Sequence, residues 1–414
     1  MSSTAKHREI EDLLRSQAPQ VLGALVRRFG HFDVAEDAVQ EALLDASQQW
    51  PETGLPDRPL SWLIRVASRS MIDLLRSDYA RRDREERVAF GRAGEDAPTA
   101  TPATGPGEQD DSLILLFMCC DPSLSAASQI ALTLRAVGGL TTEEIAAAFL
   151  VPDATMGQRI SRAKQIIKKA GASFRLPSVA ELPDRLAAVL HVLYLIFNEG
   201  YVATSGRELS RNDLSAEAIR LTRMLHRSLP DEGEAAGLLA LMLLTDARRP
   251  ARAKSDGSAV PIAEQDRTLW SQALIEEGTD LVTDAMSRSR LGPYQVQAAI
   301  AALHDEPPRA QDTDWRQILA LYAVLERLDE SPMVTLNKAV ATAMVAGPQA
   351  GLNLLAQLDD DERIARHHRL AAVRGHLLEM AGRLPEAVVA YREAAQRTTS
   401  TPERRHLQAR AARL

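Results

Sequence analysis

The chain has 414 residues, of which 45% are hydrophobic, 25% charged and only 4% aromatic, and its formal net charge is −7. A net negative charge excludes a protein that binds polyanions over its whole surface, so any DNA contact must come from local basic faces. The two cysteines, Cys119 and Cys120, are adjacent. This excludes an unstrained disulfide between them and a zinc site of CxxC spacing, and it favours a reducing, cytoplasmic compartment. We expect neither a metal nor a cofactor.

Abundant Ala, Leu, Glu and Arg with few β-branched runs predict an all-α chain. The N-terminus lacks the apolar core of a signal peptide. Residues 8–49 predict two or more helices, the last of which has one apolar face made of Ala35, Ala38, Val39, Ala42, Leu43 and Ala46. Another side of this helix carries Asp37, Gln40, Glu41 and Asp45. Such an acidic stripe is either a solvated face or a partner-binding face.

The residues from Trp50 to Pro59 predict a Pro/Gly-rich loop. A basic helix follows, in which Leu60, Leu63, Ala67, Met71 and Leu74 keep helical spacing. Its arginines and aromatics are Arg65, Arg69, Arg76, Arg81, Arg82, Arg84, Trp62 and Tyr79. Arginines with nearby aromatics suit a phosphate backbone and unstacked bases, although the same pattern fits a solvated helix with a core tryptophan. Residues 91–111 have the composition of a flexible linker.

Residues 112–172 predict a second small helical unit that ends in a helix-turn-helix. Thr141 and Glu144 have capping-box spacing, and Pro152 separates the two helices. In the second helix an apolar stripe is formed by Met156, Ile160, Ala163 and Ile167. The opposite side offers Gln158, Arg162, Gln165 and Lys169, with Arg159 on its flank. This pattern favours a helix that reads the major groove over an ordinary surface helix.

The order of these elements resembles that of the extracytoplasmic-function (ECF) sigma factors, small bacterial transcription initiation factors that keep only conserved regions 2 and 4. The resemblance rests on three segments, AEDAVQEALLDA, WLIRVASRSMIDLLR and LTTEEIAAAFLVPDATMGQRISRAK. It covers residues 8–172 and implies a region 2 domain at 8–90, a linker at 91–111 and a region 4 domain at 112–172. It further implies two partners, promoter DNA and core RNA polymerase, the latter through its β′ clamp helices and its β flap.

The resemblance also implies roles for individual residues. The polymerase-binding set is Asp37, Gln40 and Glu41. The set for the −10 promoter element is Trp62, Arg65, Arg69 and Arg76. The set for the −35 element is Thr155, Gln158, Arg159 and Arg162. Many ECF sigma factors have Asn at the position of Arg69, and Val-Lys-Ser is frequent at the position of Met156-Gly157-Gln158. We therefore expect this chain to prefer different bases in the −10 and −35 elements from those that many members prefer.

Residues 177–414 form a long helical extension that a minimal sigma factor lacks. Near its end, five residues follow the spacing of a tetratricopeptide repeat, Gly375, Gly382, Ala387, Tyr391 and Ala394. A weaker copy surrounds Gly347. We therefore expect a TPR-like helical-repeat domain that regulates or supports the sigma portion in cis, as in the sigma subgroup with long helical C-terminal extensions, and that can bind a regulatory protein or ligand.

The sequence thus predicts an alternative sigma factor that directs core RNA polymerase to specific promoters. The alternative is a stand-alone helix-turn-helix regulator with a ligand- or protein-sensing repeat domain, which would need no polymerase-binding face. An enzyme is disfavoured, because the chain has no phosphate-binding Gly-rich loop, nucleophile elbow or HExxH motif.

Overall fold

The computed structural model describes residues 3–90, 111–149, 151–170, 174–201, 212–254 and 258–414, without the side chains of 3–9, 11–12, 78–90 and 212. The predicted linker, apart from Asp111, lies outside these residues, as does Leu150 of the predicted turn. Over the described ranges the chain is helical, as predicted, and its one β feature is an isolated bridge between Ala253 and Ala259. No helix in this part of the chain combines the length and apolarity needed to cross a membrane. The chain divides into two compact units, residues 1–193 and 194–414.

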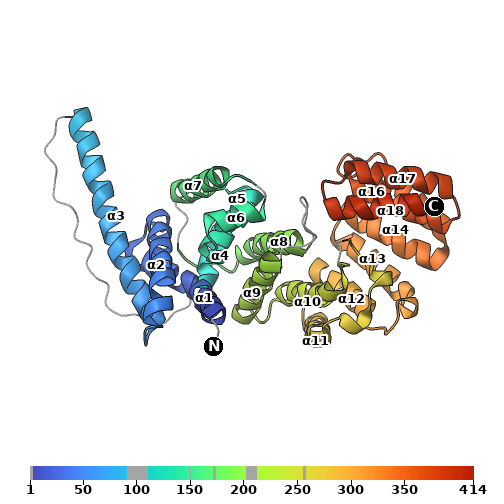
Figure 1. Cartoon of the computed structure of the whole chain (residues 1–414), viewed down its shortest axis with the longest axis horizontal. Helices are drawn as coiled ribbons and strands as arrows, with labels where there is room; N and C mark the ends of the chain where they lie inside the picture. Colours follow the sequence, from blue (N-terminus) through green and yellow to red (C-terminus); the bar gives the residue numbers. More distant parts are fainter. Residues whose placement is uncertain (1–2, 91–110, 150, 171–173, 202–211, 255–257) are drawn as a thin grey trace. The chain divides into compact units, whose positions relative to one another are not determined.

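The first unit begins with three helices, α1 (Ser3–Phe29), α2 (Phe32–Thr53) and α3 (Pro59–Phe90). The predicted apolar face of α2 is buried against its neighbours, and α3, which packs along α2, extends well past it (Figure 1). Gly30 and His31 both have positive φ angles, of 70° and 45°, and make the tight turn between α1 and α2. These three helices form the bundle that carries the predicted region 2.

The predicted loop at Trp50–Pro59 was wrong at its start. Helix α2 continues through Pro51 to Thr53, and the loop begins only at Gly54, whose φ is 85°. The buried Trp50 ring packs edge-to-face against Trp62, with ring centroids 5.4 Å apart, and this contact holds the last turn of α2. Tertiary packing therefore outweighs the tendency of Pro51 to interrupt a helix.

Four shorter helices follow, α4 (Ser112–Cys119), α5 (Ala126–Ala136), α6 (Thr142–Ala148) and α7 (Asp153–Ala170). The predicted capping box is present: the Glu144 backbone N–H donates to Thr141 Oγ1 at 3.1 Å, and the Thr141 N–H donates to Glu144 Oε2 at 2.7 Å. Helices α6 and α7 pack together as the predicted helix-turn-helix. Cys119 and Cys120 are fully buried in this core, and burial raises the pKa of Cys120 to about 12, so both are packing thiols.

Helix α8 (Leu182–Tyr201) contains the boundary between the two units. Its first turns belong with region 4. There Arg185 donates to the Asp121 carboxylate at 2.7 Å and to the backbone oxygen of Phe117 at 2.6 Å. The predicted start of the extension at residue 177 would separate this arginine from its partners.

After the end of α8, the described part of the second unit consists of helices, each of which packs on the next one along the chain. They are α9 (Asn212–Ser228), α10 (Gly233–Ala247), α11 (Gln272–Arg288), α12 (Pro293–Asp305), α13 (Trp315–Leu328), α14 (Pro332–Ala346), α15 (Pro348–Ala356), α16 (His368–Met380), α17 (Leu384–Arg397) and α18 (Thr401–Arg413). Its described residues also form four 3-10 turns, at Arg249–Ala251, Ile262–Glu264, Arg267–Leu269 and Ala310–Asp312.

The predicted repeat residues make the α16–α17 hairpin. A Cβ atom on Gly375 would lie 2.9 Å from the Tyr391 ring, so the missing side chain makes room for the tyrosine. Gly382 turns the chain between the helices with φ of 73°, and Gly347 does the same between α14 and α15 with φ of 92°. Both hairpins therefore turn at a glycine that the predicted repeat pattern contains, and the TPR-like assignment itself stays a prediction.

Candidate functional site

The predicted DNA-reading helix, α7, has two distinct faces. Met156, Ile160, Ala163 and Ile167 are buried and hold the helix on its unit. On the other side Thr155, Gln158 and Arg162 are exposed, and Arg159 is half-buried. The helix therefore presents hydrogen-bond donors and positive charge on a rigid element, which is what base-edge readout in a major groove requires.

Helix α3 presents the predicted −10 residues along its exposed side. Arg65, Arg69 and Arg76 are exposed, and Trp62 is half-buried because part of its ring packs on Trp50. The arginines are thus available to phosphates, whereas Trp62 has a structural contact beside any role toward bases. The side chains of Tyr79, Arg81, Arg82 and Arg84 lie outside the described residues.

The predicted polymerase-binding residues lie on α2 in three different environments. Glu41 is exposed and accepts a hydrogen bond from the Ser70 hydroxyl of α3. Gln40 is half-buried. Asp37 keeps 61% of its side chain exposed, yet its carboxylate accepts a hydrogen bond from Lys164 of α7 at 2.6 Å. The structure therefore brings one member of the polymerase-binding set against region 4.

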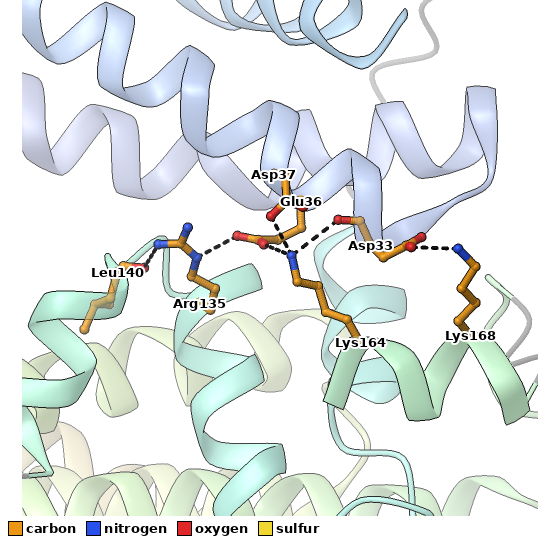
Figure 2. A network of polar contacts seen from close by, with 7 residues as sticks. All are labelled: Asp33, Glu36, Asp37, Arg135, Leu140, Lys164 and Lys168. Carbon is orange, nitrogen blue, oxygen red and sulfur yellow. Dashed lines mark hydrogen bonds and ion pairs between the residues drawn. The ribbon is translucent and has the colours of Figure 1, made fainter. Parts of the chain in front are cut away.

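Asp37 belongs to a larger group of charges that joins α2 to α5 and α7 (Figure 2). At its centre Glu36, only 1% exposed, accepts from Arg135 Nε of α5 and from Lys164 Nζ, each at 2.7 Å. Lys164 also donates to the backbone oxygen of Asp33 at 3.3 Å, and Lys168 donates to the Asp33 carboxylate at 2.8 Å. We call this group the α2–α7 contact: Asp33, Glu36 and Asp37 on α2, with Arg135, Lys164 and Lys168.

The central pair is held in its charged form. Burial acts to raise the pKa of Glu36, but Lys164 and Arg135 outweigh it and lower the pKa below the ordinary 4.5. Burial acts to lower the pKa of Lys164, but Glu36 and Asp37 outweigh it and raise the pKa above the ordinary 10.5. A carboxylate that faces two cations and an ammonium that faces two carboxylates thus compensate one another inside the contact.

Helix α1 adds a second line of contact with region 4. Arg15 donates to Glu144 of α6 at 2.9 Å, and Arg27 pairs with the buried Asp111 at the start of α4. Gly139 lies between α5 and α6, and a Cβ there would come within 3.3 Å of the Arg15 backbone. Its own φ of 70° is one that only glycine adopts readily. Regions 2 and 4 therefore meet along both α1 and α2.

Sequence reasoning missed Glu36, Arg135 and Lys164. Two of them carried a signal: Glu36 falls inside the apolar face of α2, and Lys164 falls inside the buried stripe of α7. A charge on a buried face needs an opposite charge nearby. The sequence does not show that Glu36 and Lys164 are each other's partners, because they lie more than 120 residues apart along the chain.

Comparison with known proteins identifies three family segments. Residues 13–81 match sigma-70 region 2, and residues 115–167 match sigma-70 region 4. Residues 185–286 match a family of unknown function, DUF6596. The first two segments contain α2 with most of α3, and the helix-turn-helix, respectively. No solved structure matches the chain.

Two relatives show how far the similarity extends. An uncharacterized protein of Rhizobium meliloti (strain 1021) is 44% identical over 399 residues, which cover 95% of this chain and 93% of that protein. The probable ECF RNA polymerase sigma factor SigI of Mycobacterium tuberculosis is 27% identical over 169 residues, which cover 40% of this chain and 54% of that protein. The chain therefore belongs to one family with the Rhizobium meliloti protein and is an alternative sigma factor, with sigma-70 regions 2 and 4 followed by a long helical extension.

Proposed function

We propose that this sigma factor holds core RNA polymerase through the acidic face of α2 and reads its promoter through α3 and α7. Asp37, Gln40 and Glu41 meet the β′ clamp helices, and region 4 meets the β flap. Trp62, Arg65, Arg69 and Arg76 serve the −10 element, and Thr155, Gln158, Arg159 and Arg162 serve the −35 element. The polymerase carries the chemistry, so the chain needs no catalytic group, and work on the chromosome places it in the cytoplasm.

One observation carries the DNA-reading part of this proposal. On α7 the apolar residues are buried and the side chains at Thr155, Gln158 and Arg162 are exposed, so the helix is anchored on one side and free to enter a groove on the other. The alternative, a stand-alone regulator, would not need the sigma-70 region 2 that residues 13–81 match.

Run-off transcription with core polymerase tests the assignment of Arg162. The templates are variants of the promoter upstream of the protein's own operon, each with one base of the −35 element changed. We expect Arg162→Ala to lose about 1–3 kcal/mol of discrimination at one base position, the worth of a bidentate base contact. Lys169→Ala is the matched control, because it removes one positive charge from the exposed end of the same helix. An equal loss by Arg162→Ala on every template would show a phosphate contact and contradict base reading.

We also propose that residues 177–414 regulate or support the sigma portion in cis, through a regulatory protein or a ligand bound by the repeats. Two features support this: the extension is longer than the DNA-binding part, and its TPR-like hairpins build a repeat surface of the type that binds partners. The match of residues 185–286 to a family of unknown function leaves the partner open.

A further inference from the structure

A hollow of about 280 Å³ lies in the second unit, where the last helix meets a much earlier part of the extension. One wall is α18, and the other is formed by Lys254 and by residues between 258 and 264. Glu264 and Arg410, which lie 146 residues apart along the chain, meet at its edge with 3.3 Å between Oε1 and Nη1. The fold therefore brings two distant segments together around one concave surface.

The charged side chains that line this hollow are mostly cationic. They are Lys254, Arg405, Arg410, Arg413, Glu264 and the titratable His406. Four permanent cations thus converge with a single carboxylate, in a chain whose net charge is −7. At about 100° per residue, the three arginines fall on one side of α18. The hollow is therefore a local concentration of positive charge in an acidic protein.

Most of these cations are not neutralised by the protein itself. Arg410 is the exception, because its Nε donates to Glu379 at 2.9 Å and its Nη1 to Glu264. Those that form no ion pair with any described residue are Lys254, Arg405 and Arg413. Their N–H groups are available to an anion that enters the hollow.

The positive potential of the hollow acts on His406. Burial lowers the pKa of His406 below the ordinary 6.5, and the surrounding cations lower it further against the opposite effect of Glu264. These cations are Arg410, Arg413 and Lys254. Cations held together in this way repel one another, and a bound anion would relieve that repulsion.

The predicted repeat residues fix one cation of the hollow in place. Tyr391 is buried beside Gly375, and its hydroxyl donates to Glu379 at 2.7 Å. The same carboxylate oxygen of Glu379 accepts from Arg410, so the α16–α17 hairpin holds this guanidinium against the hollow. A cation positioned before the ligand arrives loses less side-chain entropy on binding.

We propose that this hollow binds a small molecule through a di- or triphosphate group. Such a group carries several negative charges and offers several oxygens to the forked N–H groups of arginine. Small molecules bind in concave sites, whereas a DNA duplex is too wide to enter this hollow. The inference names the class of ligand for the regulatory role proposed for the extension, and it rests on that role for its use in the cell.

Isothermal titration calorimetry of the full-length protein with pyrophosphate tests the site. We expect Arg405→Gln and Arg413→Gln each to weaken binding about tenfold, the worth of one charge-assisted hydrogen bond. Lys254→Gln should do the same from the opposite wall. All three side chains are exposed, so the melting temperature of the free protein should not change. Arg392→Gln is the matched control, because it removes an exposed arginine of α17 that does not line the hollow, and it should bind as the wild type does.

A second measurement reports where the anion binds. In NMR spectra of the protein with isotope-labelled histidine, the resonance that His406→Gln removes should titrate at a higher pKa once pyrophosphate is bound. The anion offsets the cations that lower this pKa in the free protein. An unchanged pKa of His406 in the saturated protein would place the anion elsewhere and contradict the site.

ATP as a second probe separates the sources of the phosphate groups. Tighter binding of ATP would indicate a nucleotide ligand, and equal binding would indicate recognition of the phosphates alone; both results support the site. The proposal is overturned if neither probe binds, if Arg392→Gln weakens binding as much as Arg405→Gln, or if Arg405→Gln weakens only the binding of promoter DNA. These assays contain no polymerase, so their outcome is independent of whether the extension regulates transcription.

Discussion

The Lys164 side chain takes part both in the buried face of α7 and in the contact of α7 with α2. Its position in the α7 stripe buries the aliphatic stem beside Ile160 and Ile167, and its ammonium reaches Glu36 and Asp37 of α2. Truncating either member of the central pair would leave a buried charge with one partner in place of two, whereas the loss of every partner costs about 3–5 kcal/mol in comparable sites. The cost here should be smaller, because Glu36 keeps Arg135 and Lys164 keeps Asp37.

Two glycines of region 4 give opposite predictions for the same substitution. Gly139→Ala should lower the free energy of unfolding by about 1 kcal/mol or more, because the residue has φ of 70° and its new Cβ would lie 3.2 Å from that of Ala18. Gly157→Ala should raise it by about 0.4–1 kcal/mol, because Gly157 is inside α7 and the nearest atom to a new Cβ is 3.9 Å away. Urea denaturation followed by circular dichroism measures both, and a stable Gly139→Ala protein would contradict the close approach of α1.

At the scale of elements, helix boundaries and faces were predictable from the sequence. The capping box at Thr141, the stripe from Met156 to Ile167 and the tyrosine of the α16–α17 hairpin depend on residues within a few turns of each other. The end of α2 was not predictable, since Trp50 depends on Trp62 across a loop. The α2–α7 contact was not predictable either, because it depends on which faces meet in three dimensions. The predicted domain boundaries and site residues stay predictions.

The α2–α7 contact should be insensitive to pH across the physiological range. Glu36 has a lowered pKa when paired, so its contribution is complete above 4.5 and is lost as the pH falls through the lowered value. Lys164 has a raised pKa, so its contribution is complete below 10.5 and is lost as the pH rises beyond the raised value. Asp33 follows the pattern of Glu36, since Lys168 outweighs the effect of burial and lowers its pKa below 3.8. Asp37 is mostly exposed to solvent and adds little.

The measurement is the distance between spin labels on cysteines placed at two exposed positions, Gln48 of α2 and Ala170 of α7, followed from about pH 3 to pH 9. We expect a constant short distance between about pH 6 and pH 9 and a lengthening in acid. Glu36→Gln serves as the comparison, since it cannot titrate and should reduce the acid transition to the part that Asp33 contributes. An opening centred near pH 6.5, where histidine titrates, would show that other groups control the contact.

At the scale of the whole molecule, the boundary between the two compact units decides where the extension can be separated from the sigma portion. The boundary falls inside α8, after Leu193, and the first turns of α8 belong to the sigma portion through Arg185. The match to the family of unknown function begins at this same arginine. A truncation intended to isolate the sigma portion should therefore keep α8.

The extension is best removed by ending the chain after Tyr201, at the end of α8. This keeps the bonds of Arg185 to Asp121 and to Phe117, so region 4 retains its support while α9 to α18 are lost. If the extension acts in cis, promoter-specific run-off transcription should differ several-fold from that of the full-length protein, while the binding of −35 DNA stays the same. Ending the chain after Leu176 is the comparison, and there −35 binding should weaken too, because Arg185 is gone. Analytical ultracentrifugation serves as the control for aggregation of the truncated protein through the apolar side of α8. Equal transcription by the Tyr201 truncation and the full-length protein under all conditions would contradict a regulatory role of the extension.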